Sequence, residues 1–287
     1  GAAAMGQSTR TMMAQIVAEQ LGGDMSLVEV VTGDTAGVPM GIGGSASRQT
    51  VTAGSSAHLA ALDVRAKALR VAAHILEASE EDLEIEGGEV RVMGVSGLSV
   101  PLGTVAHAVA GTPGFALPGG IEPGMESTQS AVIDDLTFAN GTQVVEVEVD
   151  PETGAVAFNN YVMVHDSGVI INPMIVDGQV IGGMAHGIGN TLYEWMGYDD
   201  HAQPLTTNYA EYLMVTAPEM PPIDLVHMES PTPLNPLGVK GVGECGIAPA
   251  SAAIVAAIED ALGPFNVRIS QVPIRPAEIV ALVSAGH

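Results

Sequence analysis

The sequence predicts an α+β fold in which strands and helices are interleaved rather than strictly alternating. Two stretches carry this prediction. Residues 142–150 alternate apolar and polar positions, turn at 151–154 and return through 155–165, which is typical of an antiparallel strand pair. Residues 56–77 instead place apolar side chains three and four positions apart, as an amphipathic helix does.

The stretch before that helix predicts a binding loop. A first helix is expected over residues 8–21, with Ser8 or Thr9 as its cap, followed by a short strand at 27–31. Residues 33–54 are rich in Gly, Ser and Thr and lead directly into the helix 56–77. A long loop that ends at a helix N-terminus is typical of anion-binding sites.

A glycine-rich helix is predicted to begin at Asn172-Pro173 and to continue to about Trp195, with proline at its first position. Each interior glycine costs about 1 kcal/mol relative to alanine, so several together need a packing reason. Close approach of another element or of a flat cofactor would supply it. The small residues concerned are Gly178, Gly182, Gly183, Ala185, Gly187 and Gly189.

The same periodicities predict the remaining elements. These are a hairpin at 83–92, a short helix at 100–109, a linker-like loop at 111–127, strands at 223–227 and 266–269, and helices at 250–262 and 276–284.

The composition indicates a chain that is covered by partners or by a large ligand. Of 287 residues 47% are hydrophobic, only 3% are aromatic, and Lys and Arg together number 9. The length allows one large or two modest domains, and we expect two, at 1–140 and 141–287. Because the sequence does not begin with Met, we expect it to be part of something longer.

The charge and the cysteine count exclude several classes of partner and site. A net charge of −24 argues against nucleic acid and anionic membranes as partners. No apolar run approaches 18 residues and no signal peptide is visible, so the cytoplasm is the expected location. The single cysteine, Cys245, excludes an internal disulfide and a cysteine-bound cluster or zinc site within the chain.

The stretch 235–246 presents one carboxylate, that of Glu244, between glycines, which makes it a candidate general base. Residues 241–246 also match G-x-G-x-x-G, so a dinucleotide-binding loop is an alternative. No apolar strand precedes this match, and no acid ends a strand about 20 residues later, which weighs against it. Cys245 is interpreted as packing rather than as a nucleophile, since nothing nearby would form a thiolate.

The histidines show no metal-ligand spacing. We interpret those within predicted helices as packing or surface residues, and His165 with Asp166 as a polar pair at a strand end.

Several motifs in order resemble the molybdopterin-binding large subunit of the molybdenum hydroxylases, the family of xanthine dehydrogenase, aldehyde oxidase and aerobic carbon monoxide dehydrogenase. The resemblance covers essentially the whole chain and only the C-terminal part of the family's subunit. The motifs lie at 5–7, 44–56, 166–173, 178–183 and 235–244.

The resemblance implies a cofactor and a set of contacts. The cofactor is molybdenum-molybdopterin, possibly in a dinucleotide form, with no side chain of this chain as a metal ligand. Ser8 stands where the family has a second glycine. The implied cofactor-binding residues are Gly6, Gln7, Thr52, Ser55, Gln179 and Gly243, and the implied catalytic residue is Glu244.

The resemblance also implies an activity and partners. The expected reaction is oxidation of a heterocycle or aldehyde C–H with oxygen from water, with Glu244 as base. Iron–sulfur clusters and FAD are expected on separate subunits, because one cysteine cannot bind a cluster. The N-terminal half of the molybdenum subunit is expected as a further partner. The alternatives are a non-catalytic assembly subunit, suggested by Ala3, Ala4 and Ser8, and the dinucleotide-binding protein.

Overall fold

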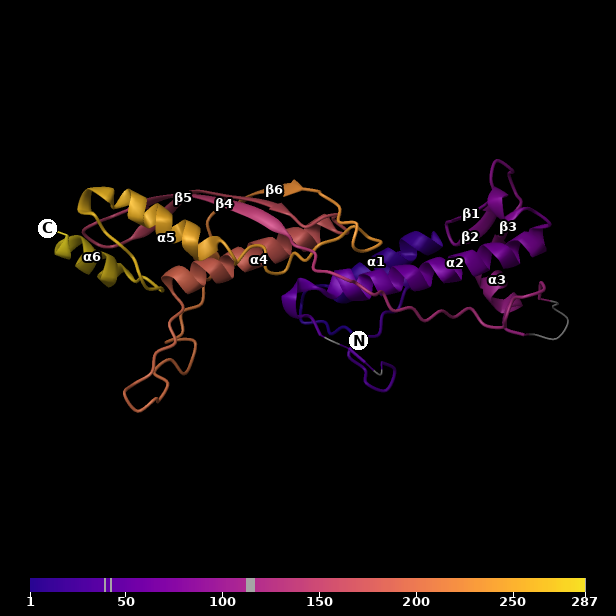
Figure 1. Ribbon diagram of the computed structural model, residues 1–287, viewed down its shortest axis with the longest axis horizontal. Coiled ribbons are helices and arrows are strands. Elements are labelled where there is room, and N and C mark those ends of the chain that lie inside the picture. The colour runs from indigo at the N-terminus through magenta and orange to yellow at the C-terminus, as the bar shows by residue number, and fades with distance from the viewer. Residues whose placement is uncertain (39, 42, 112–116, 287) are drawn as a thin grey trace. The chain divides into compact units, whose positions relative to one another are not determined.

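A computed structural model describes residues 1–38, 40–41, 43–111 and 117–286 (Figure 1). The chain divides into two compact units, one of residues 1–136 with 232–239 and one of residues 137–231 with 240–287. Positions 39 and 42 of the predicted loop 33–54, and 112–116 of the predicted loop 111–127, lie outside the described residues.

The first unit is built on two packed helices, α1 (Thr9–Leu21) and α2 (Ser55–Leu76). A helical turn with π-type bonding, Thr50–Gly54, directly precedes α2, so helical structure begins inside the predicted loop. The capping prediction for α1 is wrong, because the Ser8 side chain makes no cap hydrogen bond and the Ser8 backbone is left-handed, with φ 60°.

A small antiparallel sheet completes this unit. Its strands β1 (Leu83–Glu86), β2 (Glu89–Val92) and β3 (Ser99–Pro101) pair in sequence order, and α3 (Leu102–Ala108) follows. The predicted hairpin is therefore present, whereas the predicted helix 100–109 begins later because its first residues belong to β3. The core joins α2 and α3 to the sheet through Val71, Ala72, Ile85, Val90 and Val105.

The predicted strand 27–31 is wrong. Asp24 accepts a hydrogen bond from the backbone N–H of Ser26 and caps a 3₁₀ turn at Met25–Leu27 instead. The apolar side chains that suggested a strand are not buried, with Leu27 84% exposed. Other 3₁₀ turns lie at Ser45–Ser47, Glu80–Asp82, Ala217–Glu219 and Gly263–Phe265.

The second unit contains a three-stranded sheet in the order β4-β5-β6. The long strands β4 (Asn140–Val149) and β5 (Val156–Asp166) are antiparallel, as the alternation predicts, and β6 (Asp224–Met228) runs parallel to β5. The glycine-rich helix α4 (Pro173–Leu192) lies in the crossover between β5 and β6, and the Asn172 side chain caps it. It ends three residues before the predicted Trp195.

Helices α5 (Ala250–Ala261) and α6 (Pro276–Ala285) agree with the prediction. In Figure 1, α4 and α5 lie side by side against the strands. The core between them contains Tyr161, Met163, Val180, Met184, Ile188, Ile254 and Ile258. The predicted strand 266–269 is wrong, because the backbone N–H of Ile269 donates to the Glu259 carboxylate at 2.7 Å and no ladder forms.

Four of the five glycines of α4 fall into two groups. A Cβ at Gly187 would lie 2.2 Å from that of Ala250, and one at Gly183 would lie 3.0 Å from the Gly246 Cα. At Gly178 and Gly182 a Cβ would meet nothing within 4 Å. Packing of α5 and of the chain before it therefore explains the glycines of the first group, but it does not explain those of the second group.

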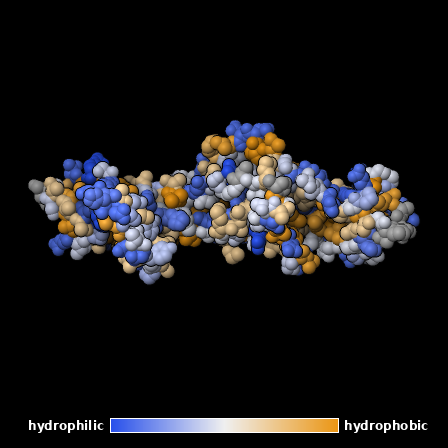
Figure 2. Space-filling view, turned by 90° about the horizontal axis from the view of Figure 1, so that it is seen from below, coloured by the Kyte–Doolittle hydropathy of each residue, from blue (hydrophilic) through white to orange (hydrophobic). Residues whose placement is uncertain are grey.

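Large apolar side chains reach the surface in several places, and Figure 2 shows hydrophobic residues scattered among hydrophilic ones. Among the described residues, no helix has the length and apolar character needed to cross a membrane. The most exposed include Leu27, Val132, Met40, Tyr209, Met174 and Phe138.

Candidate functional site

Glu244 lies on a turn of the second unit, residues 240–246, that is anchored where it begins. The Lys240 ammonium lies 2.7 Å from an Asp166 carboxylate oxygen, and its backbone N–H donates to the Ser167 carbonyl at 2.7 Å. Asp166 also accepts from the backbone N–H groups of Gly168 and Ser230. Burial opposes ionisation of Asp166, but these donors outweigh it and lower its pKa to about 2.

The same turn is anchored where it ends. The Gln143 side chain on β4 donates to the Gly246 carbonyl at 2.7 Å and accepts from the Tyr161 hydroxyl of β5 at 2.7 Å. A Cβ at Gly246 would lie 2.2 Å from the Val180 carbonyl oxygen of α4, so only glycine fits this contact.

This packing brings three of the predicted site residues into one region. Gln179 precedes Val180 on α4, and Gly243 and Glu244 come directly before the segment that packs on it. Glu244 is exposed, and its backbone carbonyl accepts from the Ala248 N–H at 3.3 Å. An accessible carboxylate on a fixed backbone is the arrangement that a general base requires.

The dinucleotide-loop interpretation is not favoured by this geometry. Residues 233–237 form turns rather than a strand before Gly241. The Cys245 thiol contacts the Gly241 carbonyl, and burial, helped by the Glu244 and Asp166 carboxylates, raises its pKa to about 11. A thiol of this kind is almost entirely protonated at neutral pH, which favours the packing interpretation.

His165 and Asp166 do not pair with each other, because adjacent strand residues point to opposite faces. The His165 Nε2 lies 2.7 Å from the His227 Nδ1, and the His227 Nε2 lies 2.8 Å from an Asp177 carboxylate oxygen. Burial, and then the neighbouring His227, lower the pKa of His165. This chain of side chains ties β5 and β6 to the first turns of α4.

Gln7 belongs to a separate network in the first unit. Its amide nitrogen donates to the Ala3 carbonyl at 3.0 Å and to the Gln49 Oε1 at 2.9 Å, and the Thr9 hydroxyl donates to the same oxygen. Gly6 has a φ of 106°, and a Cβ there would meet nothing within 4 Å. Sequence reasoning missed Gln49, whose only signal is its position before the turn Thr50–Gly54.

Thr52 and Ser55 lie at the N-terminal end of α2. The Thr52 hydroxyl donates to the Arg48 carbonyl at 3.0 Å. Ser55 is fully buried, and its hydroxyl has no hydrogen-bond partner among the described residues. Because Gln49 immediately precedes this turn, the Gln7 network and these two hydroxyl groups occupy the same end of α2.

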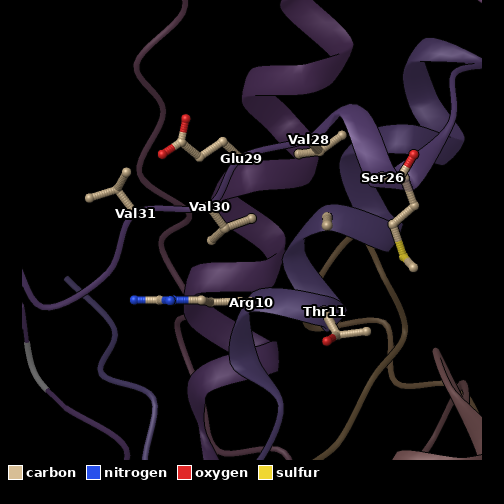
Figure 3. A pocket seen from close by; sticks show the side chains of 9 residues that line it. Arg10, Thr11, Ser26, Val28, Glu29, Val30 and Val31 are labelled. Atoms are coloured by element: carbon tan, nitrogen blue, oxygen red, sulfur yellow. The ribbon is translucent and has the colours of Figure 1, made fainter.

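A pocket of about 470 Å³ lies between the start of α1 and residues 25–31 (Figure 3). Val28, Val30 and Val31 line it together with Arg10 and Glu29. None of the predicted site residues is among those that line it.

Comparison with known proteins identifies the cofactor class. A family model described as a molybdopterin cofactor-binding domain matches residues 1–221. The nicotine 6-hydroxylase large subunit of Paenarthrobacter nicotinovorans is 38% identical over 98% of this chain and 34% of its own length. The carbon monoxide dehydrogenase large chain of Hydrogenophaga pseudoflava is 32% identical over 95% of this chain and 34% of its own length.

A comparison with solved structures finds similar proteins. The crystal structure of quinoline 2-oxidoreductase from Pseudomonas putida 86 matches with a TM-score of 0.88 and 40% identity, over 98% of this chain and 36% of the other. The chain thus spans about a third of the length of the relatives that it matches.

Proposed function

Because the chain belongs to the molybdopterin cofactor-binding domain family of molybdenum hydroxylase large subunits, we propose that it holds the cofactor and supplies Glu244 as the general base. The placement of Glu244 carries this proposal. Its turn packs directly on α4 at Val180, beside Gln179, and the adjoining Gly178 and Gly182 leave that stretch of backbone open.

The donor groups present fit such a cofactor. Molybdopterin is flat, polar and carries phosphate, and backbone N–H groups and hydroxyls can bind it without basic side chains. The buried Ser55 hydroxyl lacks a partner among the described residues, which costs about 1–3 kcal/mol and fits a site completed by a ligand. The proposed cofactor-binding residues are Gly6, Gln7, Thr52, Ser55, Gln179 and Gly243.

When bound, molybdenum would supply the centre that accepts two electrons from the substrate. Glu244 would accept the proton that is released when water-derived oxygen is activated. A positioned base of this kind contributes about 10² to 10⁴ in rate.

The substrate class is proposed from the relatives. Two of them are named for nicotine and quinoline, which are nitrogen heterocycles. We propose oxidation of an electron-poor C–H of a heterocycle or aldehyde, in the cytoplasm. Subunits bearing iron–sulfur clusters and FAD, and the remaining part of the large subunit, would be the partners, and the pterin would be bound in a dinucleotide form. We propose residues 1–140 and 141–287 as two molybdopterin-binding domains, the second of which carries Glu244.

Replacing Glu244 with Gln in the assembled molybdenum enzyme tests the proposal. Quinoline, nicotine and benzaldehyde serve as probe substrates with an artificial electron acceptor. We expect turnover to fall at least 100-fold while molybdenum content is retained. Glu148→Gln, an exposed carboxylate of β4, is the matched control and should change nothing. Turnover of Glu244→Gln within twofold of the wild type would refute the role as base and would favour a non-catalytic assembly subunit.

A further inference from the structure

The turn that carries Glu244 is held by residues distant from it in sequence. We propose that Gln143 and Asp166, at the β4 and β5 strands, are positioning residues that fix the Glu244 carboxylate for proton transfer. This inference rests on the proposed role of Glu244 as base. Neither residue touches the reacting atoms, and both act through the backbone of residues 240–246.

Asp166 fixes the beginning of the turn. Its side chain and that of Lys240 are 10% and 11% exposed, and their 2.7 Å contact is supported by backbone donors from Gly168 and Ser230. The Lys240 backbone N–H also bonds to the Ser167 carbonyl. The Asp166 carboxylate is thus held by three donors, and an ion pair fixed in this way resists a shift of Lys240 along β5.

Gln143 fixes the end of the turn. The Tyr161 hydroxyl donates to its amide oxygen, so its amide nitrogen must face the Gly246 carbonyl, which it contacts at 2.7 Å. Tyr161 is 1% exposed, and burial raises its pKa, so it remains a protonated donor. The direction of both hydrogen bonds is therefore determined.

The third support is α4. The backbone of Gly246 packs closely on this helix, since a Cβ at Gly246 would lie 2.2 Å from the Val180 carbonyl oxygen and 2.7 Å from the Met184 nitrogen. Within the turn, the Cys245 N–H donates to the Val242 carbonyl at 3.1 Å. Glu244 thus extends from a backbone supported before it, after it and behind it.

The expected cost of losing one support follows from the geometry of catalysis. A displacement of about 1 Å at a reacting group lowers the rate by up to about 10²-fold without weakening substrate binding. We therefore expect Gln143→Leu and Asp166→Asn to lower kcat by about 10- to 100-fold, with KM and molybdenum content unchanged.

The experiment uses the assembled enzyme, with quinoline, nicotine and benzaldehyde as probes. Gln143→Leu keeps the side-chain volume and tests the idea even if Asp166→Asn, which leaves Lys240 buried without its partner, fails to fold. Both variants are also combined with Glu244→Gln. The second readout is amide hydrogen exchange of residues 241–248, which needs no turnover and should become at least tenfold faster.

The outcomes separate this inference from the proposed function. If the supports act through Glu244, adding Gln143→Leu to Glu244→Gln causes no further loss of turnover. Losses that multiply, or unchanged hydrogen exchange in Gln143→Leu, would overturn the positioning role while leaving Glu244 as base. Full activity of Glu244→Gln instead overturns the proposed function itself.

Discussion

Four glycines of α4, at 178, 182, 183 and 187, allow a test in which two substitutions should stabilise the chain and two should destabilise it. Replacing each with alanine removes the glycine penalty, which is worth about 1 kcal/mol in a helix interior. At Gly178 and Gly182 the new Cβ meets nothing within 4 Å, so each substitution should raise the free energy of unfolding by about 0.5–1 kcal/mol.

The other two substitutions meet backbone or a fixed side chain. At Gly183 the Cβ would approach the Gly246 Cα to 3.0 Å and the Ile247 nitrogen to 3.1 Å, and at Gly187 it would approach the Ala250 Cβ to 2.2 Å. Overpacking of this kind costs about 1–3 kcal/mol. After the helix gain is subtracted, Gly183→Ala should lose up to about 2 kcal/mol, and Gly187→Ala should lose at least as much.

Urea unfolding of the chain, monitored by circular dichroism, measures the free energy of unfolding of all four variants. The molybdenum content of the assembled enzyme is a second measurement, because a methyl group on the open face at Gly182 would obstruct a flat ligand. We therefore expect Gly182→Ala to stabilise the chain and to lower its molybdenum content. A destabilised Gly182→Ala, or a Gly187→Ala as stable as the wild type, would refute the packing argument.

Two further predictions concern charge and backbone conformation. The pKa of Asp166 falls from 3.8 to about 2 on folding, which is worth about 2 kcal/mol of stability. Because the folded pKa is the lower one, this contribution is present above pH 4 and is lost as the pH falls through 2. In urea unfolding, the loss of unfolding free energy caused by Asp166→Asn should therefore shrink over that range. A loss that stays constant with pH would contradict this prediction. Ser8 has φ 60° and no cap bond, so Ser8→Gly should stabilise the chain by about 0.5–1 kcal/mol in thermal unfolding, whereas Ser8→Ala should not; equal effects of the two would count against strain at this position.

Sequence periodicity predicted the elements that bury one face. The β4–β5 pair and α2 alternate or repeat over many residues, and each supplies buried side chains to a core. The two strands that were wrong are short apolar runs. In each, a nearby carboxylate, that of Asp24 or Glu259, accepts a backbone N–H and gives the chain an alternative to a strand ladder.

The candidate site was predictable where glycine marks a close approach. The glycines of 241–246 and those of α4 each suggested a close approach, but nothing in the sequence predicted that these two segments contact each other. Gln143 and Tyr161 could not be found in this way, because they occupy ordinary positions in alternating strands and their role depends on a pairing across 103 residues. The same holds for Gln49, which meets Gln7 only after α2 folds against α1.

The division of the chain has a consequence for comparing and recombining relatives. Residues 232–239 belong to the unit formed by residues 1–136, although the residues on both sides of them belong to the other. No single crossover point along the gene separates the two units, and a chimaera joined at 136/137 would take this segment from the wrong parent. Asn235 makes two side-chain hydrogen bonds to the Val239 backbone. In a chimaera, it should therefore come from the same parent as residues 1–136, rather than from the parent of the residues next to 232–239.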